Sequence, residues 1–279
     1  MSKHVLKIEF DKSINIWYNS ITTLKEINMT ERQEKIYKIL EKKGSISVEQ
    51  MVRELYISEA TARRELSSME LDGLLVRTWG GAVATKGANR DIPIFVRSKT
   101  NVKEKNTIAR LAIELLKDNM TVFLSSSNTV ARLATYFHKY ENLTVITNGL
   151  ETLGALNNHL SAKIILTGGD LYENYDFVGA LAEDTIEKFN ADLFFFSCSG
   201  ITAEGFSSVD PLRLSIFNKM MKNSAKTVLL ADTSKVGKKF TYNGFGLEKI
   251  DHVIMEKRPN DPALIKALGK KLITPKRFG

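Results

Sequence analysis

Five short polar segments each follow an apolar run of the kind that forms a buried β-strand. They are SSSNT (125–129), TNG (147–149), TGGD (167–170), SCSG (197–200) and DTSK (232–235). Their small residues allow backbone amides to approach an oxyanion closely, and the lysine of the last segment adds a positive charge. A phosphorylated small molecule fits this chemistry. Ordinary turns would explain any one segment, whereas five at one sheet edge favour a binding site.

A second polar group lies on one face of the segment SEATARRELSSMEL, residues 58–71. At about 100° per residue, Ala62, Leu66 and Met69 fall within about 60° of one another and predict the buried face of a helix. The opposite face carries Ala60, Thr61, Arg63, Arg64, Ser67 and Ser68. This face suits the major groove of DNA, because small residues permit close approach and arginine binds guanine or phosphate. The alternative is a three-helix bundle whose two arginines are merely solvated.

Two shorter helices are expected to precede and support this one. Thr30 with Gln33, and Ser47 with Gln50, each form the pattern of a helix capping box. Ser58 is placed to cap the third helix, whose first turn then holds the polar face described above. The three helices together predict a helix-turn-helix.

A hairpin is expected to follow the third helix. LLVRT reads as a strand, WGG as a tight turn and AVAT as a returning strand, which together form the wing of a winged helix-turn-helix. Arg77 and Trp79 lie where a wing meets phosphate or the minor groove. For Trp79 the sequence leaves two possibilities open, a DNA contact or packing against the helices.

The segment ISEATARRELSSMELDGLLVRTWGGA resembles the helix-turn-helix signature of the DeoR family of bacterial transcriptional regulators. The matching positions are Ser58, Thr61, Arg63, Arg64, Leu66, Gly73, Leu74, Leu75, Arg77, Gly80, Gly81 and Ala82. Glu65 replaces an aspartate of the pattern, and Trp79 stands where histidine is frequent. The resemblance implies operator DNA as a partner, contacted by Ser58, Ala60, Thr61, Arg63, Arg64, Ser67, Arg77 and Trp79.

From about residue 101 onward, helical patterns alternate with short apolar strands. Strands are predicted at 121–124, 143–147, 162–167, 192–196 and 226–231. Their continuous apolar composition is typical of parallel strands covered on both faces. The predicted fold class is therefore α/β, with a small winged helix-turn-helix domain followed by an open, mostly parallel α/β sheet domain.

Residues 95–255 resemble the effector domain of DeoR-family regulators, which is related to ribose-5-phosphate isomerase and in most members recognises a sugar phosphate. The resemblance rests on EKNTIARLA, TVITNG, ILTGGDL, FVGALA, ADLFFFSCSGITAEGF and KNSAKTVLLADTSKVG, which stand in family order. It implies that the effector site is lined by Ser127, Asn128, Thr129, Thr147, Asn148, Gly168, Gly169, Gly200 and Lys235.

The chain departs from the family pattern inside this site. Ser125 replaces an aspartate, Ser127 a glycine and Asn128 a hydroxyl residue, while Arg213 and Phe217 replace an acid and a lysine. One interpretation is a changed effector, with Ser125 and Arg213 joining the site and Arg213 binding the anion. The alternative is a domain that has lost its ligand and serves assembly.

The chain divides into five predicted segments. They are an extension (1–28), the winged helix-turn-helix (29–86), a linker (87–105), the α/β effector-binding and oligomerisation domain (106–258), and a carboxy-terminal helix with a basic tail (259–279). We hypothesise that translation begins at Met29, since the codons of Lys25 and Glu26 can encode a ribosome-binding sequence. A genuine additional arm is the competing interpretation.

Composition excludes several classes of protein. No apolar run reaches the length of a membrane span, and the amino end lacks the core of a signal peptide, so we expect a cytoplasmic protein with no membrane partner. Cys198 is the single cysteine and the four histidines are scattered, which predicts neither a disulfide nor a metal site, and no cofactor is expected. The net charge of +8 decides little, since residues 30–84 hold nine bases and nine acids.

These observations predict a DNA-binding transcriptional regulator, a repressor of a sugar-metabolism operon, controlled by a phosphorylated sugar or related metabolite. A homodimer or homotetramer is expected, because one recognition helix does not supply genomic specificity. Two alternatives remain open: a non-sensing architectural DNA binder, and a sugar-phosphate isomerase. The isomerase is disfavoured because the SSSNT segment has no carboxylate or histidine to act as a general base.

Overall fold

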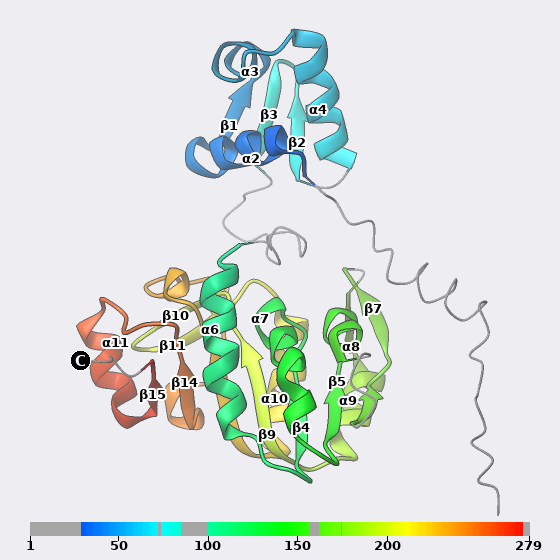
Figure 1. Ribbon diagram of the computed structural model, residues 1–279, viewed down its shortest axis with the longest axis vertical. Helices are drawn as coiled ribbons and strands as arrows, with labels where there is room; N and C mark the ends of the chain where they lie inside the picture. Colours follow the sequence, from blue (N-terminus) through cyan, green and yellow to red (C-terminus); the bar gives the residue numbers. More distant parts are fainter. Residues whose placement is uncertain (1–28, 72–73, 85–99, 157–161, 174, 276–279) are drawn as a thin grey trace, which may run out of the picture. The chain divides into compact units, whose positions relative to one another are not determined.

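The computed structural model describes residues 29–71, 74–84, 100–156, 162–173 and 175–275 (Figure 1). The described residues form two compact units, one ending at Thr85 and the other beginning at Lys86. The predicted extension 1–28 lies outside the described residues, as does most of the predicted linker. Each unit is described by itself below.

The amino-terminal unit is a winged helix-turn-helix. Its elements, in chain order, are α2 (Glu31–Lys43), β1 (Ser45–Ser47), α3 (Val48–Leu55), α4 (Glu59–Leu71), β2 (Leu75–Thr78) and β3 (Gly81–Ala84). The three strands form an antiparallel sheet in the order β1-β3-β2. The three helices and the hairpin were predicted, whereas β1, with only three residues, was not.

Local sequence signals determine where these helices begin and end. Thr30 Oγ1 accepts a hydrogen bond from Gln33 N at 3.2 Å, and Gln33 Oε1 accepts one from Thr30 N at 3.0 Å. Ser47 and Gln50 repeat this capping box at the start of α3. Both predicted boxes are confirmed. Gly44 ends α2 with φ +78°, a left-handed conformation that a glycine adopts without the steric cost of a Cβ.

The helices pack through the apolar residues predicted for their inner faces. Ile36, Met51, Ala62, Leu66 and Met69 have no exposed surface. This cluster fixes the orientation of α4, so the polar residues on its other face point away from the core. Burying these side chains is the main favourable term for such a small unit, at about 1.5–3 kcal/mol for each large side chain.

The carboxy-terminal unit is built on a seven-stranded sheet in which every neighbouring pair is parallel. The strands are β4 (Thr121–Leu124), β5 (Thr144–Thr147), β6 (Lys163–Leu166), β9 (Ala191–Ser197), β12 (Ser224–Leu230), β14 (His252–Ile254) and β15 (Leu272–Ile273). Their order is β15-β14-β12-β9-β4-β5-β6. All five predicted strands are present, and the α/β class is confirmed.

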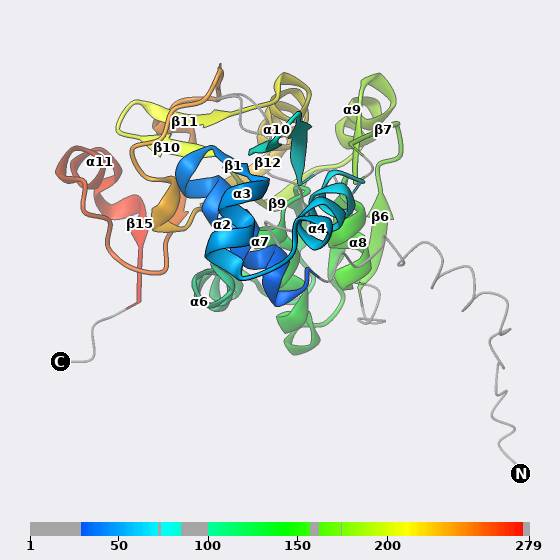
Figure 2. The same ribbon diagram turned by 90° about the horizontal axis from the view of Figure 1, so that it is seen from above.

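Helices cover both faces of this sheet (Figures 1 and 2). The helical segments are α6 (Val102–Ala112), α7 (Asn128–Ala131), η2 (Arg132–Lys139), α8 (Leu150–Leu156), α9 (Ala180–Glu187), α10 (Pro211–Lys222) and α11 (Pro262–Leu268). Alternate residues of β9 divide between the two cores, since Phe194 and Phe196 belong to one buried cluster and Phe195 to the other. A central strand buried on both faces explains its run of three phenylalanines.

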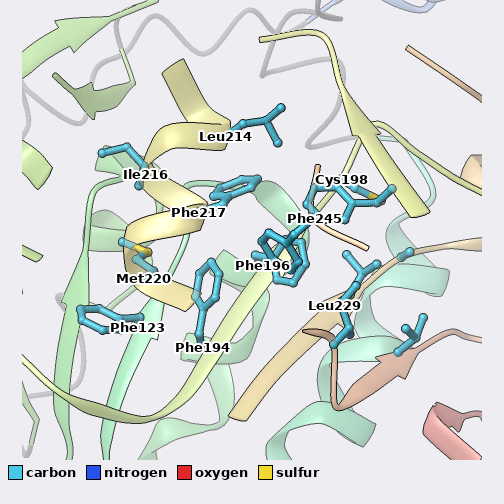
Figure 3. Packing of buried hydrophobic residues seen from close by; sticks show 14 of the residues in the cluster. Phe123, Phe194, Phe196, Cys198, Leu214, Ile216, Phe217, Met220, Leu229 and Phe245 are labelled. Atoms are coloured by element: carbon cyan, nitrogen blue, oxygen red, sulfur yellow. The ribbon is translucent and has the colours of Figure 1, made fainter. Parts of the chain in front are cut away.

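The first cluster is rich in aromatic rings that pack against one another (Figure 3). The ring centroid of Phe217 lies 6.1 Å from that of Phe194 and 5.5 Å from that of Phe196, at tilted angles typical of aromatic pairs. Phe206 and Phe245 extend the cluster. Phe217, which stands where the family pattern has a lysine, is therefore a core residue and does not face an anion.

Two strands of the sheet were not predicted. β14 pairs with β12, and β15 pairs with β14 in the register Val253↔Leu272. The segment predicted as a helix and basic tail therefore contains α11 and then a strand of the main sheet. Lys271, predicted to be solvated, donates to the backbone oxygens of Leu247 and Glu248 at 2.9 and 3.1 Å. Lys276 and Arg277 lie outside the described residues.

The end of the predicted linker is helical. α6 begins at Val102, so the last four residues of the predicted linker 87–105 belong to its first turn. Lys105 is buried there, with 6% of its surface exposed. Two small antiparallel sheets complete the unit: β7 (Asp170–Tyr172) with β8 (Asp176–Val178), and β10 (Gly200–Thr202) with β11 (Gly205–Ser208) and β13 (Tyr242–Asn243).

Candidate functional site

The first candidate site is the outer face of α4 together with the wing. Ser58 Oγ accepts a hydrogen bond from Thr61 N at 3.2 Å, as expected of a cap at the start of α4. Ala60, Arg63, Arg64 and Ser68 are exposed, and Thr61 and Ser67 are half-buried. The predicted small and basic face is therefore accessible to a partner.

The charged side chains of this face differ in their interaction partners. Arg63 forms an ion pair with Glu59 one turn earlier, at 3.4 Å. Glu65, the departure from the family's aspartate, accepts from Arg32 of α2 at 3.0 Å and so joins the first and third helices. Arg64, with Thr61, lies beside a shallow hollow of about 370 Å³ between these two helices.

The wing is fixed to α4 by Arg77. Its guanidinium donates to Ser67 Oγ at 2.7 Å and to the backbone oxygen of Arg63 at 3.4 Å, and its backbone N donates to Glu70 Oε1 at 2.9 Å. Arg77 and Ser67, both predicted to contact DNA, therefore contact each other. Arg77 connects the hairpin to the recognition helix.

Trp79 projects from the tip of the wing. Its side chain is fully exposed, which excludes the alternative that it packs against the helices. The tip itself is rigidly seated, since Gly80 O accepts from Val48 N at 2.8 Å. A Cβ on Gly81 would lie 2.1 Å from Ile46 O, so only glycine allows β3 to approach β1 this closely.

The second candidate site is the carboxyl edge of the main sheet. The five polar segments follow β4, β5, β6, β9 and β12, which are consecutive in the sheet order, so the parallel topology brings their ends to one edge as predicted. Hydrogen bonds connect residues of these segments in two groups. One group lies around Asn148 and Asp176, and the other around Lys235 and Asp232.

In the first group, Asn148 joins three loops. Its Oδ1 accepts from Ser126 N at 3.1 Å, and its Nδ2 donates to the backbone oxygen of Phe177 at 3.0 Å. Asp176, which is completely buried, accepts from the hydroxyl of Ser126. A Cβ on Gly149 would lie 2.7 Å from Ser126 Cα, so this loop crossing also requires a glycine.

The SSSNT segment holds one buried hydroxyl that its neighbours do not use. Among the described residues, Ser125 Oγ is buried and has no hydrogen-bond partner. Ser127 is otherwise engaged, because its Oγ caps α7 by accepting from Val130 N at 3.1 Å. Asn128 and Thr129 are buried, and the Asn128 amide donates to the carboxylate of Glu151 at the start of α8. An unpaired buried hydroxyl costs about 1–3 kcal/mol unless a ligand or water satisfies it.

The second group contains two lysines. Lys235 Nζ donates to Ser197 Oγ at 2.7 Å, and Ser197 Oγ donates to the backbone oxygen of Leu230 at 2.7 Å. Asp232 is 2% exposed, and burial acts to raise its pKa. Lys235, a hydrogen bond from Ser234 and Lys105 outweigh burial and hold the pKa of this carboxyl below its ordinary value of 3.8. Lys235 and Lys105 therefore both favour the charged form of Asp232, just after β12.

The start of α6 is attached to this second group. Asn101, the residue before α6, donates from Nδ2 to Asp232 Oδ1 at 3.1 Å and to Ser234 Oγ at 3.2 Å. Sequence reasoning assigned no role to Asn101 or Lys105, because their partners lie about 130 residues away in the chain. The motif EKNTIARLA pointed to this helix but not to its contacts.

The glycines of the remaining segments serve packing. Gly168 and Gly169 have φ +66° and +114°, and a Cβ on Gly169 would lie 2.6 Å from Val178 O. A Cβ on Gly200 would lie 2.2 Å from Lys238 O. Close backbone approach therefore explains Gly169 and Gly200 without a ligand, and the left-handed φ explains Gly168, whose Cβ would meet nothing within 4 Å. Thr147 is buried, and its Oγ1 accepts from Gly149 N at 3.2 Å.

Arg213 does not occupy the position expected of an anion-binding group. Its Nε donates to Asp176 Oδ2 and its Nη2 to Glu173 Oε2, both at 2.6 Å, and its side chain is 8% exposed. The guanidinium also lies 5.1 Å from the ring centroid of Tyr175. Two carboxylates neutralise its charge, which corrects the expectation that Arg213 takes over anion binding. Family resemblance identified the position, but only the structure shows its partners.

Two further groups near the edge have perturbed acidities. Burial, followed by a hydrogen bond to Asp210, raises the pKa of Tyr172 to about 12. Burial raises the pKa of the Cys198 thiol to about 11, against a smaller lowering effect of Lys235. Both groups are therefore neutral at physiological pH.

The fold and the two sites define a class of protein, a DNA-binding regulator in which a winged helix-turn-helix precedes a separate α/β unit with a polar strand edge. Comparison with known families agrees with this class. Residues 32–87 match the DeoR-like helix-turn-helix domain and residues 100–257 match the DeoR C-terminal sensor domain. The chain belongs to the DeoR family of transcriptional regulators.

Curated relatives span nearly the whole chain. The regulator GolR of Listeria innocua is 35% identical over 243 residues, covering 86% of this chain and 94% of the relative. The L-fucose operon activator of Haemophilus influenzae is 34% identical, covering 82% and 92%. The lactose phosphotransferase system repressor of Lactococcus lactis is 32% identical, covering 75% and 84%.

Structural neighbours are more distant. A D-ribose-5-phosphate isomerase in complex with phospho-erythronic acid aligns over 48% of this chain and 54% of its own, with a TM-score of 0.37 and 11% identity. At this level the similarity carries no inference about activity. Within the residues that the structure describes, no helix is long and apolar enough to cross a membrane.

Proposed function

We propose that this regulator represses an operon of sugar metabolism and that a phosphorylated sugar, or a related phosphorylated metabolite, controls it by binding at the carboxyl edge of the sheet. The observation that carries the proposal is the hydrogen bond from Lys235 Nζ to Ser197 Oγ, at 2.7 Å, at an edge rich in hydroxyl groups, with the buried Lys105 near enough to lower the pKa of Asp232. Lysine supplies the point charge that phosphate binding uses. The unpartnered Ser125 hydroxyl adds a hydrogen-bonding group at the same edge.

The proposed effector site differs from the one that the sequence predicted. It keeps Ser125, Ser127, Asn128, Thr129, Thr147, Asn148 and Lys235, and it adds Lys105. Gly169 and Gly200 shape the edge through close backbone packing, and Gly168 through its left-handed conformation. Arg213 is omitted because its charge is already neutralised by Asp176 and Glu173.

Asn101 supplies a route from ligand to DNA. An anion held by Lys235 and Lys105 would weaken their attraction to Asp232, and Asn101 hydrogen-bonds to Asp232 immediately before α6. The part of the chain that leads from the DNA-binding unit ends immediately before Asn101. Binding of the ligand would thereby change how the DNA-binding units of a homodimer or homotetramer meet two operator half-sites. The proposed location of this regulator is the cytoplasm.

A non-sensing regulator is the second candidate, because most polar groups at the edge already bond to one another. A catalytic role is less well supported. Asp176 is engaged by Arg213 and Ser126, and Asp232 caps the turn at Ser234, so neither carboxylate is available as a general base. The named relatives above are regulators, which supports the same conclusion.

Thermal unfolding with a panel of pentose and hexose phosphates tests the proposal. A ligand at 100 times its dissociation constant stabilises the unit that binds it by about 2.7 kcal/mol. We expect at least one phosphorylated sugar to raise the midpoint while the same sugar without phosphate does not. If no phosphorylated compound changes the midpoint or the DNA affinity, the non-sensing candidate is correct.

A further inference from the structure

We infer that two exposed aromatic side chains, Tyr56 and Trp79, form a pair of DNA contacts at the two ends of α3, the helix that precedes the recognition helix α4. The inference rests on the DNA-binding function of the family and deepens it. Trp79 was predicted as a DNA contact from its place in the wing. Tyr56 is assigned here for the first time, from its conformation and exposure.

Tyr56 is unusual at the end of a helix. It caps α3 with φ 53° and ψ 46°, in the left-handed region that glycine normally occupies at such ends. For a residue with a Cβ this conformation is sterically unfavourable. Gly44 ends α2 in the ordinary way. The fold thus bears a cost at Tyr56 that a glycine would remove.

The fold gains nothing in return from the tyrosine side chain. Tyr56 is 93% exposed and Trp79 is fully exposed, so neither ring is buried against the unit. Large aromatic side chains contribute most when a partner covers them. A tyrosine in a strained and exposed position therefore points to a contact outside the chain.

The two rings lie at opposite ends of α3. Val48, the first residue of α3, donates its N–H to Gly80 O at 2.8 Å, which places the wing tip and Trp79 at one end of the helix. Tyr56 is at the other end. With eight residues, α3 rises about 12 Å, which is close to the major-groove width of about 12 Å.

This spacing fits the way a helix-turn-helix lies on DNA. When the recognition helix enters the major groove, the preceding helix crosses the backbone. Tyr56, two residues before the cap of α4, is then beside a phosphate, to which its hydroxyl can donate. Trp79 is beside the adjacent strand or the minor groove, where apolar side chains insert between base steps.

Because the amino-terminal unit carries little net charge, uncharged side chains are expected to contribute more to its DNA binding. Residues 30–84 hold as many acids as bases. Arg32 and Arg63 are each paired with a glutamate, and Arg77 is bonded to Ser67. Because these three cations also have partners within the unit, neutral donors such as a tyrosine hydroxyl can supply part of the backbone binding.

The test uses the full chain and a duplex obtained by selecting random-sequence DNA for binding to it. We expect Tyr56→Phe to weaken binding about five-fold, since it removes one hydrogen bond worth about 1 kcal/mol. Tyr56→Asn should weaken binding at least as much while leaving the unfolding midpoint unchanged or higher, because asparagine tolerates the left-handed region. The salt dependence of binding should not change, because no charge is lost.

Tyr242→Phe, an exposed tyrosine of the other unit, is the matched control and should bind the duplex as the parent does. If both Tyr56 variants bind with unchanged affinity, the inference is wrong. If Tyr56→Asn or Trp79→Ala instead changes the sedimentation mass, these rings contact a second copy of the chain, which also overturns it. Failure of the parent chain to select any duplex would count against DNA binding itself.

Discussion

The recognition face of α4 and the carboxyl edge of the main sheet use polar residues in opposite ways. On α4 the polar side chains are exposed, as at Arg63 with 52% of its side chain accessible, and they make few internal bonds. At the sheet edge Asp176 is fully buried, and Arg213 and Asp232 are nearly so, each bonded within the unit. Changes on the recognition face should therefore alter binding, whereas changes at the edge should also alter stability.

The largest expected effect is at the edge. Arg213→Met leaves the buried carboxylate of Asp176 without its cation, which should destabilise the α/β unit by about 3–5 kcal/mol. Urea unfolding of the full chain measures this change. The double variant Arg213→Met with Asp176→Asn should recover part of the loss, because no buried charge is then unpaired. A loss below about 1 kcal/mol in the single variant would contradict the buried ion pair.

On the recognition face, Arg64→Ala should change binding and not stability. We expect the free energy of operator binding to weaken by about 1–3 kcal/mol. If Arg64 contacts a phosphate, the salt dependence of binding should fall by about one contact, and if it contacts a base, the base preference should relax at one position. The free energy of unfolding should stay within about 0.5 kcal/mol of the parent, since the side chain is exposed. Fluorescence anisotropy and urea unfolding on the same preparation measure both. A matching loss of stability would remove the contrast between the two regions.

Of the two binding activities, Lys235→Met should weaken the response to ligand and leave DNA binding intact. The hydrogen bond of a charged group contributes about 1.5–3 kcal/mol, so affinity for a phosphorylated effector should fall by about 10-fold or more. DNA binding without effector should remain that of the parent. Isothermal titration of the compound identified in the thermal panel gives the first value, and anisotropy gives the second. Equal loss of operator binding in Lys235→Met and Arg64→Ala would undo the division between the two regions.

The smallest expected effect concerns pH. The pKa of Asp232 is lower in the folded chain than its ordinary value of 3.8, so this group stabilises the fold above that value. The contribution is lost as the pH falls through the lowered pKa. Asp232→Asn should therefore show a shallower loss of unfolding free energy between pH 5 and pH 3 than the parent. An identical slope in the two proteins would show that the carboxylate is not selectively stabilised.

The same contrast explains what the sequence could predict. In the amino-terminal unit the capping boxes, the buried stripe and the hairpin are local patterns, and the structure confirms each of them. Only β1 was missed, because three residues give too short a pattern. The parallel sheet was predicted for the same reason, from five strands with continuous apolar composition.

The contacts at the sheet edge could not be predicted, because they join residues distant in the chain. Arg213 meets Asp176 across 37 residues, and Asn101 meets Asp232 across 131. Arg213 was expected to face an anion because its charge was known and its partners were not. Lys105 was assigned to a linker because Asp232, the carboxylate whose pKa it lowers, lies 127 residues away in the chain. β15 was missed because two residues show no alternation.

One titration decides whether a phosphorylated metabolite at the sheet edge controls DNA binding. The affinity of the full chain for its selected duplex is measured with each pentose and hexose phosphate, and again with Lys235→Met. We expect at least one phosphorylated sugar to change the affinity for DNA by about 5- to 150-fold. The same sugar without phosphate should leave that affinity unchanged, and Lys235→Met should abolish the change. Unchanged affinity with every compound would contradict the proposal.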